Sequence, residues 1–70
     1  MKISARNMLP ATVTRVTRGA VNCEVEMTLR GGDKVVASIT LASADSLGLV
    51  EGKAAYAVIK ASSVMVGVEH

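Results

Sequence analysis

An unbroken alternation of apolar and polar residues from Val21 to Arg30 constrains the fold of this chain more than any other feature. The apolar positions of this stretch are Val21, Cys23, Val25, Met27 and Leu29. Successive side chains of a β-strand point to opposite faces of the sheet, with a period of two residues. The alternation therefore predicts a strand with one buried face and one face in water.

A weaker alternation precedes it, from Ala11 to Thr17, and predicts a partner strand. Its apolar residues Val13 and Val16 are out of phase with each other, and one extra residue in a β-bulge would reconcile them. The turn residues Arg18-Gly19-Ala20 separate the two stretches. We therefore expect the two strands to form a hairpin.

Two further turns introduce more strands. Gly31-Gly32-Asp33 leads into an alternating stretch at Lys34–Leu41, and Glu51-Gly52 leads into the apolar stretch Lys53–Lys60. A last stretch, Val64–Val68, has apolar residues at nearly every position. Each of these three stretches predicts a short strand.

Between the third and fourth long strands, Ala42–Leu47 lacks β-branched residues and predicts one or two turns of helix. Thr40 or Ser43 would cap its start, and Gly48 would adopt the left-handed conformation that ends many helices. Five or six strands with one short helix in this order predict an all-β fold, a small OB-like Greek-key barrel. A small SH3-like barrel is the alternative.

Residues 1–70 are expected to form a single domain that needs additional stabilisation. Chains of this size bury only about 60% of the surface that the unfolded chain exposes. Tyr56 is the only aromatic residue, and Cys23 has no second cysteine with which to form an internal disulfide. The last two predicted strands are apolar on both faces, which predicts that a second copy covers one of them. The alternative is an aggregation-prone edge.

Composition excludes several functional classes. No apolar run approaches the ~18 residues of a membrane-spanning helix, so no membrane partner is expected. A single unpaired cysteine fits a reducing, cytoplasmic compartment. Catalysis is not expected, because the only histidine is the last residue, His70, and Cys23 lies on the inward face of its strand with no histidine available to activate it. Single-stranded nucleic acid remains an alternative ligand, although Tyr56 lies in a strand that is expected to be buried and offers no aromatic platform by itself.

Three polar segments are candidates for binding a small anion. Ser4, Arg6 and Asn7 supply a hydroxyl, a guanidinium and an amide within four positions, although they could equally be solvated groups of an edge strand. Lys60-Ala61-Ser62-Ser63 adds a cation, small residues and hydroxyls, or is an ordinary turn. Arg18–Asn22 is the third candidate. The alternative is an ordinary hairpin turn, whose own geometry would account for Gly19 without any ligand.

The chain resembles a known family through three segments taken together: Ser4-Ala5-Arg6-Asn7, Gly19-Ala20-Val21-Asn22 and Ala57–Ser62. It resembles the molbindins, the small Mop proteins that bind molybdate, from Met1 to about Val68. The resemblance implies an OB-like barrel that assembles as a homo-hexamer, a trimer of dimers. It implies no cofactor, and it implies molybdate or tungstate as the ligand, held at subunit interfaces.

The resemblance also implies which residues bind the oxyanion. A main site would use Ser4, Ala5, Arg6 and Asn7 of one subunit, completed by Lys60, Ala61 and Ser62 of a neighbour. A second type of site, near the symmetry axis, would involve Gly19, Val21 and Asn22. The implied role is non-enzymatic storage or homeostasis of intracellular molybdenum.

Overall fold

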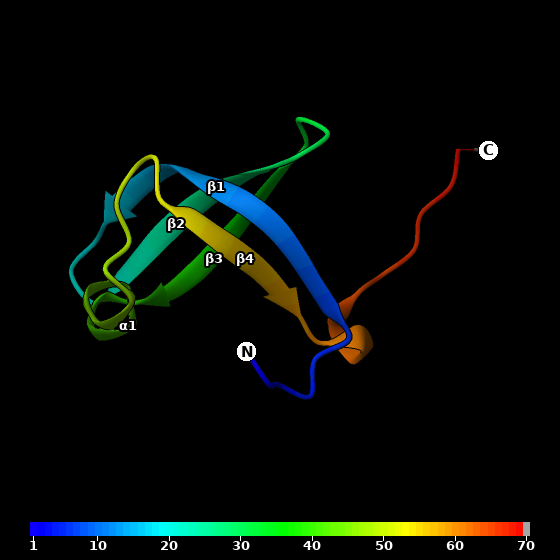
Figure 1. Cartoon of the computed structure of the whole chain (residues 1–70), viewed down its shortest axis with the longest axis horizontal. Coiled ribbons are helices and arrows are strands. Elements are labelled where there is room, and N and C mark those ends of the chain that lie inside the picture. Colours follow the sequence, from blue (N-terminus) through cyan, green and yellow to red (C-terminus); the bar gives the residue numbers. More distant parts are fainter. Residues whose placement is uncertain (70) are drawn as a thin grey trace.

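The computed structural model describes residues 1–69, which form one curled antiparallel sheet with a short helix at one end (Figure 1). His70 lies outside the described residues. The elements are β1 (Asn7–Arg18), β2 (Asn22–Leu29), β3 (Lys34–Thr40), α1 (Leu41–Leu47), β4 (Ala54–Ile59) and the 3₁₀ turn η1 (Ala61–Ser63). The strand order is β3-β2-β1-β4, so β3 and β4 are the two edges of a half-barrel. The expected all-β class with one short helix is confirmed.

The predicted β-bulge is present in β1. Val13 pairs with Met27 and Arg15 pairs with Glu26, so Thr14 is the extra residue that shifts the register. The Thr14 hydroxyl turns to the polar face and donates a hydrogen bond of 3.1 Å to the Glu26 carboxylate. The bulge brings Val13 and Val16 onto the packed face, where Val13 is completely buried and Val16 packs against the core.

The core is small and lacks aromatic residues. Its buried members are Val13, Cys23, Val25, Met27, Ala44 and Ala57. The alternation in β2 is confirmed, because every second residue from Cys23 to Met27 is buried. Tyr56 corrects one expectation: it belongs to an apolar strand but is 54% exposed, because β4 turns only the face of Ala55 and Ala57 toward the core.

Helix α1 is capped at both ends as the sequence predicts. The Thr40 hydroxyl accepts a hydrogen bond from the Ser43 backbone N–H at 3.0 Å, which makes Thr40 the N-cap residue. Gly48 has φ 63°, the left-handed conformation that an L side chain rarely adopts. The Lys53 ammonium then donates to the carbonyls of Leu47 at 2.7 Å and Gly48 at 3.2 Å, where the helix leaves acceptors unpaired.

Residues 64–68, hereafter the C-terminal arm, do not form the predicted strand. After η1 the chain leaves the sheet and runs outward (Figure 1). Its large apolar side chains are at least half exposed, from 50% at Val64 to 92% at Met65. The sheet accordingly has four strands instead of five or six. The arm does carry the apolar residues that predicted a strand, but within residues 1–69 no strand pairs with it.

No helix in the described part of the chain is long and apolar enough to cross a membrane.

Candidate functional site

Two of the segments singled out from the sequence meet at one end of the sheet. Asn7, the first residue of β1, is the register partner of Ile59, the last residue of β4. Ser4, Ala5 and Arg6 directly precede Asn7, and Lys60, Ala61 and Ser62 directly follow Ile59. We call these seven residues the SARN–KAS group: Ser4, Ala5, Arg6, Asn7, Lys60, Ala61 and Ser62. In Figure 1 the start of β1 lies beside η1.

A side-chain hydrogen bond fixes this junction. The Asn7 amide Nδ2 donates to the backbone carbonyl of Ile59 at 3.1 Å, and the Asn7 side chain is partly buried. An amide nitrogen carries two donors. One of them holds the N-terminal segment against the end of β4, and the other makes no hydrogen bond within the described residues.

Most other members of the group are more exposed than Asn7. Ser4, Arg6, Lys60 and Ser62 are exposed, and Ala5 is half-buried. Lys60 and Ala61 supply carbonyls that accept from the Ser63 and Val64 amides at 2.9 and 3.3 Å, which curls η1 into a turn. The side chains of Arg6 and Lys60 extend from this compact backbone into open solvent.

Positive charge at this end of the molecule is unbalanced. Within residues 1–69 the ion pairs join Arg18 to Asp45 and Lys34 to Glu26, and neither Arg6 nor Lys60 takes part in one. Five of the six Asp and Glu residues lie on other elements or turns, at Glu24, Glu26, Asp33, Asp45 and Glu51, and the sixth, Glu69, follows the C-terminal arm and pairs with neither cation. Two free cations with hydroxyl and amide donors form a surface that favours a small anion.

The third segment, Gly19, Val21 and Asn22, is held apart from the SARN–KAS group. We call these three residues the hairpin group. It spans the β1–β2 turn and the first residue of β2, Asn22, beyond Arg18 at the opposite end of β1. The Gly19 amide already donates to the Asn22 carbonyl at 2.8 Å, and the Val21 carbonyl accepts from the Leu41 amide at 3.0 Å. A Cβ at Gly19 would lie 3.0 Å from the Asn22 carbonyl oxygen, so a larger residue would crowd the turn there.

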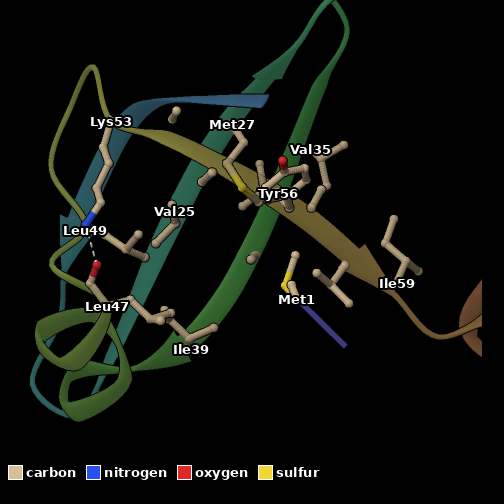
Figure 2. A pocket seen from close by; sticks show the side chains of 16 residues that line it. Met1, Val25, Met27, Val35, Ile39, Leu47, Leu49, Lys53, Tyr56 and Ile59 are labelled. Atoms are coloured by element: carbon tan, nitrogen blue, oxygen red, sulfur yellow. Dashed lines mark hydrogen bonds between the residues drawn. The ribbon is translucent and has the colours of Figure 1, made fainter. Parts of the chain in front are cut away.

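Sequence reasoning missed an open apolar groove of about 560 Å³ on the concave side of the sheet (Figure 2). It runs between the edge strands β3 and β4, and its lining includes Val25, Met27, Val35, Ile39, Leu49 and Ile59. Lys53 is its only charged lining residue, and its ammonium is occupied at the end of α1. The period-2 patterns predict an apolar face, but only the curvature of the sheet makes it a groove.

No three His, Cys, Asp or Glu side chains converge within the described residues as a site for a bare cation would require. The polar groups that do converge are donors and cations.

Comparison with known proteins identifies the family of this chain. Residues 3–66 match the TOBE domain. The chain belongs to the TOBE domain family. A probable molybdenum-pterin-binding protein of Haemophilus influenzae is 49% identical to this TOBE domain over 69 residues, which cover 99% of this chain and 100% of that relative.

Two solved structures resemble this chain closely. A molybdate-binding protein from Sporomusa ovata has a TM-score of 0.91 at 40% identity, covering 97% of this chain and 100% of that one. ModG, a cytoplasmic molybdate-binding protein solved with molybdate bound, has a TM-score of 0.83 at 56% identity, covering 87% of this chain and 43% of ModG. The resemblance to the Mop proteins and the OB-like fold class are thereby confirmed.

Proposed function

We propose that this protein binds molybdate or tungstate as an intact oxyanion and serves in intracellular storage or homeostasis of the metal, without enzymatic activity. The observation that carries the proposal is the pairing of Asn7 with Ile59. This pairing brings two polar segments from opposite ends of the chain into one exposed, cationic group. The relatives named for molybdate or molybdenum-pterin binding support the same ligand class.

The chemistry of the group suits a fully deprotonated anion. Arg6 and Lys60 offer only donors, and Ser4, Ser62 and the free Asn7 N–H can all donate as well. Molybdate is a bare dianion at neutral pH and accepts at every oxygen. Phosphate is partly protonated there, and its O–H can donate only to a Ser4 or Ser62 oxygen; where it faces Arg6, Lys60 or the Asn7 N–H, the clash costs about 1–3 kcal/mol. Sulfate is also a bare dianion, but its shorter bonds give poorer contacts in a cradle sized for the larger ion.

We propose further that the site is completed between copies of the chain in a homo-hexamer, a trimer of dimers. In one copy the cradle is open, because Ser4, Arg6, Lys60 and Ser62 are all exposed. Under this proposal, two copies meet at this end of the sheet, where the Asn7–Ile59 pairing places both segments of each copy, and Lys60, Ala61 and Ser62 of one copy enclose an anion held by Ser4–Asn7 of the other.

Two apolar surfaces support assembly. The groove between β3 and β4 is lined by apolar side chains, and the C-terminal arm presents Val64, Met65, Val66 and Val68 to solvent. Exposed apolar surface of this extent marks an interaction site in a folded protein. Residues 1–70 would then act as one domain whose stability depends partly on its copies. A single buried cysteine fits the proposed cytoplasmic location.

Isothermal titration calorimetry of the purified protein with molybdate, tungstate, sulfate and phosphate tests the function. We expect tight binding of the first two ions and weak or absent binding of the others. Equal heats for molybdate, sulfate and phosphate would contradict it. Native mass spectrometry with and without molybdate tests the assembly, and a monomer that binds with full affinity would contradict sites shared between copies.

A further inference from the structure

The ion pair between Arg18 and Asp45 lies beside the hairpin group. The Arg18 guanidinium contacts the Asp45 carboxylate at 2.9 Å, which joins the end of β1 to helix α1. Arg18, the last residue of β1, directly precedes Gly19, and the turn itself contains no cation. The Leu41 amide, which donates to the Val21 carbonyl at 3.0 Å, fastens the start of α1 to the same turn. Asp45 is therefore held close to the hairpin group by two links.

The position of Asp45 within its own helix is unfavourable. Asp45 lies in the last turn of α1 (Leu41–Leu47), where the partial negative charge of the helix end disfavours a carboxylate. Lys53 donates to the Leu47 and Gly48 carbonyls at that end, but its ammonium forms no ion pair with Asp45 among the residues described. The ion pair with Arg18 is the contact that stabilises the Asp45 carboxylate at this end of the helix.

The two candidate groups consequently differ in electrostatics. The SARN–KAS group has two unpaired cations, Arg6 and Lys60. In the hairpin group the Gly19 N–H is already engaged, and the one neighbouring cation is neutralised by Asp45. Among the described residues, the donors left without a partner there are the side-chain amide of Asn22 and the backbone N–H groups of Ala20 and Val21, none of which carries a charge. A dianion at the hairpin would also lie near the Asp45 carboxylate and be repelled by it.

We propose that Asp45 is a positioning residue that pairs with Arg18 and thereby keeps the hairpin group a weak site for tetrahedral dianions, so that the SARN–KAS group fills first. This inference rests on the proposed oxyanion binding and goes beyond it, because it ranks the two groups and assigns the ranking to a residue outside both.

The test removes the charge of Asp45 and keeps its shape. Asp45→Asn retains an oxygen that can accept from Arg18, while Asp33→Asn removes the same charge from a distant turn and serves as the matched control. Sodium molybdate, and separately sodium sulfate, is titrated into the ¹⁵N-labelled assembly, and the backbone amide signals of residues 19–22 and 4–7 are followed by NMR.

In Asp45→Asn we expect the hairpin signals to reach half-saturation at a molybdate concentration about fivefold lower than in Asp33→Asn, with the gain shrinking at high salt. Residues 4–7 should titrate alike in both variants. The double variant Arg18→Gln with Asp45→Asn should lose the gain, which a purely structural effect of the helix substitution would not do.

The outcomes separate this inference from the proposed function. If residues 4–7 titrate but the hairpin responds equally in the two single variants, the role of Asp45 is overturned and the oxyanion site stands. A wild-type hairpin that saturates as readily as residues 4–7 would also overturn it. If neither segment responds to molybdate, the proposed function itself fails.

Discussion

The side chain of Asn7 donates a hydrogen bond of 3.1 Å to the backbone carbonyl of Ile59, a residue 52 positions later in the sequence. This contact closes the end of the β1–β4 ladder and brings Arg6 and Lys60, the residues next to the pair, to the same end of the sheet. Since both cations are exposed and lack carboxylate partners within residues 1–69, their charge is available to a ligand. A structural hydrogen bond thus organises the proposed binding surface.

Replacing Arg6 by alanine should weaken molybdate binding by about 1.5–3 kcal/mol, the range for a hydrogen bond to a charged group. Arg15→Ala is the matched control, because Arg15 is also exposed and also lacks an ion pair in the described residues, but it lies in the interior of β1. Calorimetry should show near wild-type affinity for the control. Equal affinities for both variants would mean that Arg6 does not contact the anion.

Asn7 should matter for both stability and binding. Asn7→Ala removes the bond to Ile59 and should lower the free energy of unfolding by about 1 kcal/mol. Asn7→Asp should be worse for binding than alanine, because a carboxylate would face the Ile59 carbonyl and repel the incoming anion. Denaturant unfolding and molybdate titration measure the two effects. An aspartate variant that binds as well as the alanine variant would remove Asn7 from the proposed site.

The N-cap assignment can be tested by two substitutions in the same turn. Thr40→Ala removes the acceptor of the Ser43 amide and should cost about 1 kcal/mol of stability. Ser43→Ala keeps that amide bond and loses only the side-chain contact with Thr40 at 2.9 Å, so it should cost clearly less. Thermal unfolding of the two variants compares them. The reverse order would assign the cap to Ser43.

The C-terminal arm should be needed for assembly. Val66 is 91% exposed, and Val66→Asp would place a charge on a surface that we propose is covered by another copy. Val50→Asp is the control, because Val50 is 62% exposed but lies in the turn before β4. We expect a smaller particle for the first variant only, measured by light scattering coupled to size-exclusion chromatography. Assemblies of unchanged mass in both would leave the arm without this role.

Single-stranded nucleic acid is the alternative ligand raised by the barrel fold. Tyr56 is exposed and could stack on one base, but no second aromatic residue exists beside it. Stacking on several aromatic side chains is what holds single strands in a groove. We therefore expect no retention of a labelled oligonucleotide at low salt, where phosphate contacts are strongest. Tight, salt-sensitive retention would favour the alternative function.

Local features were readable from the sequence because their physical causes are local. The alternation around Val25 depends only on the two-residue period of a strand, and the phase slip between Val13 and Val16 required an extra residue. The caps of α1 follow from a hydroxyl at Thr40 and a residue without Cβ at Gly48. The motifs of the SARN–KAS group were visible as short polar strings, and their resemblance to the Mop proteins named a ligand class.

What the sequence left open depends on contacts between distant residues. Tyr56 was expected to be buried because β4 is apolar on both faces, and the curvature of the sheet decided which face is covered. The arm has the apolar pattern of a strand, but pairing requires a partner edge, and residues 1–69 place none beside it. The pairing of Asn7 with Ile59 and of Arg18 with Asp45 joins residues far apart in the chain, which no local periodicity encodes.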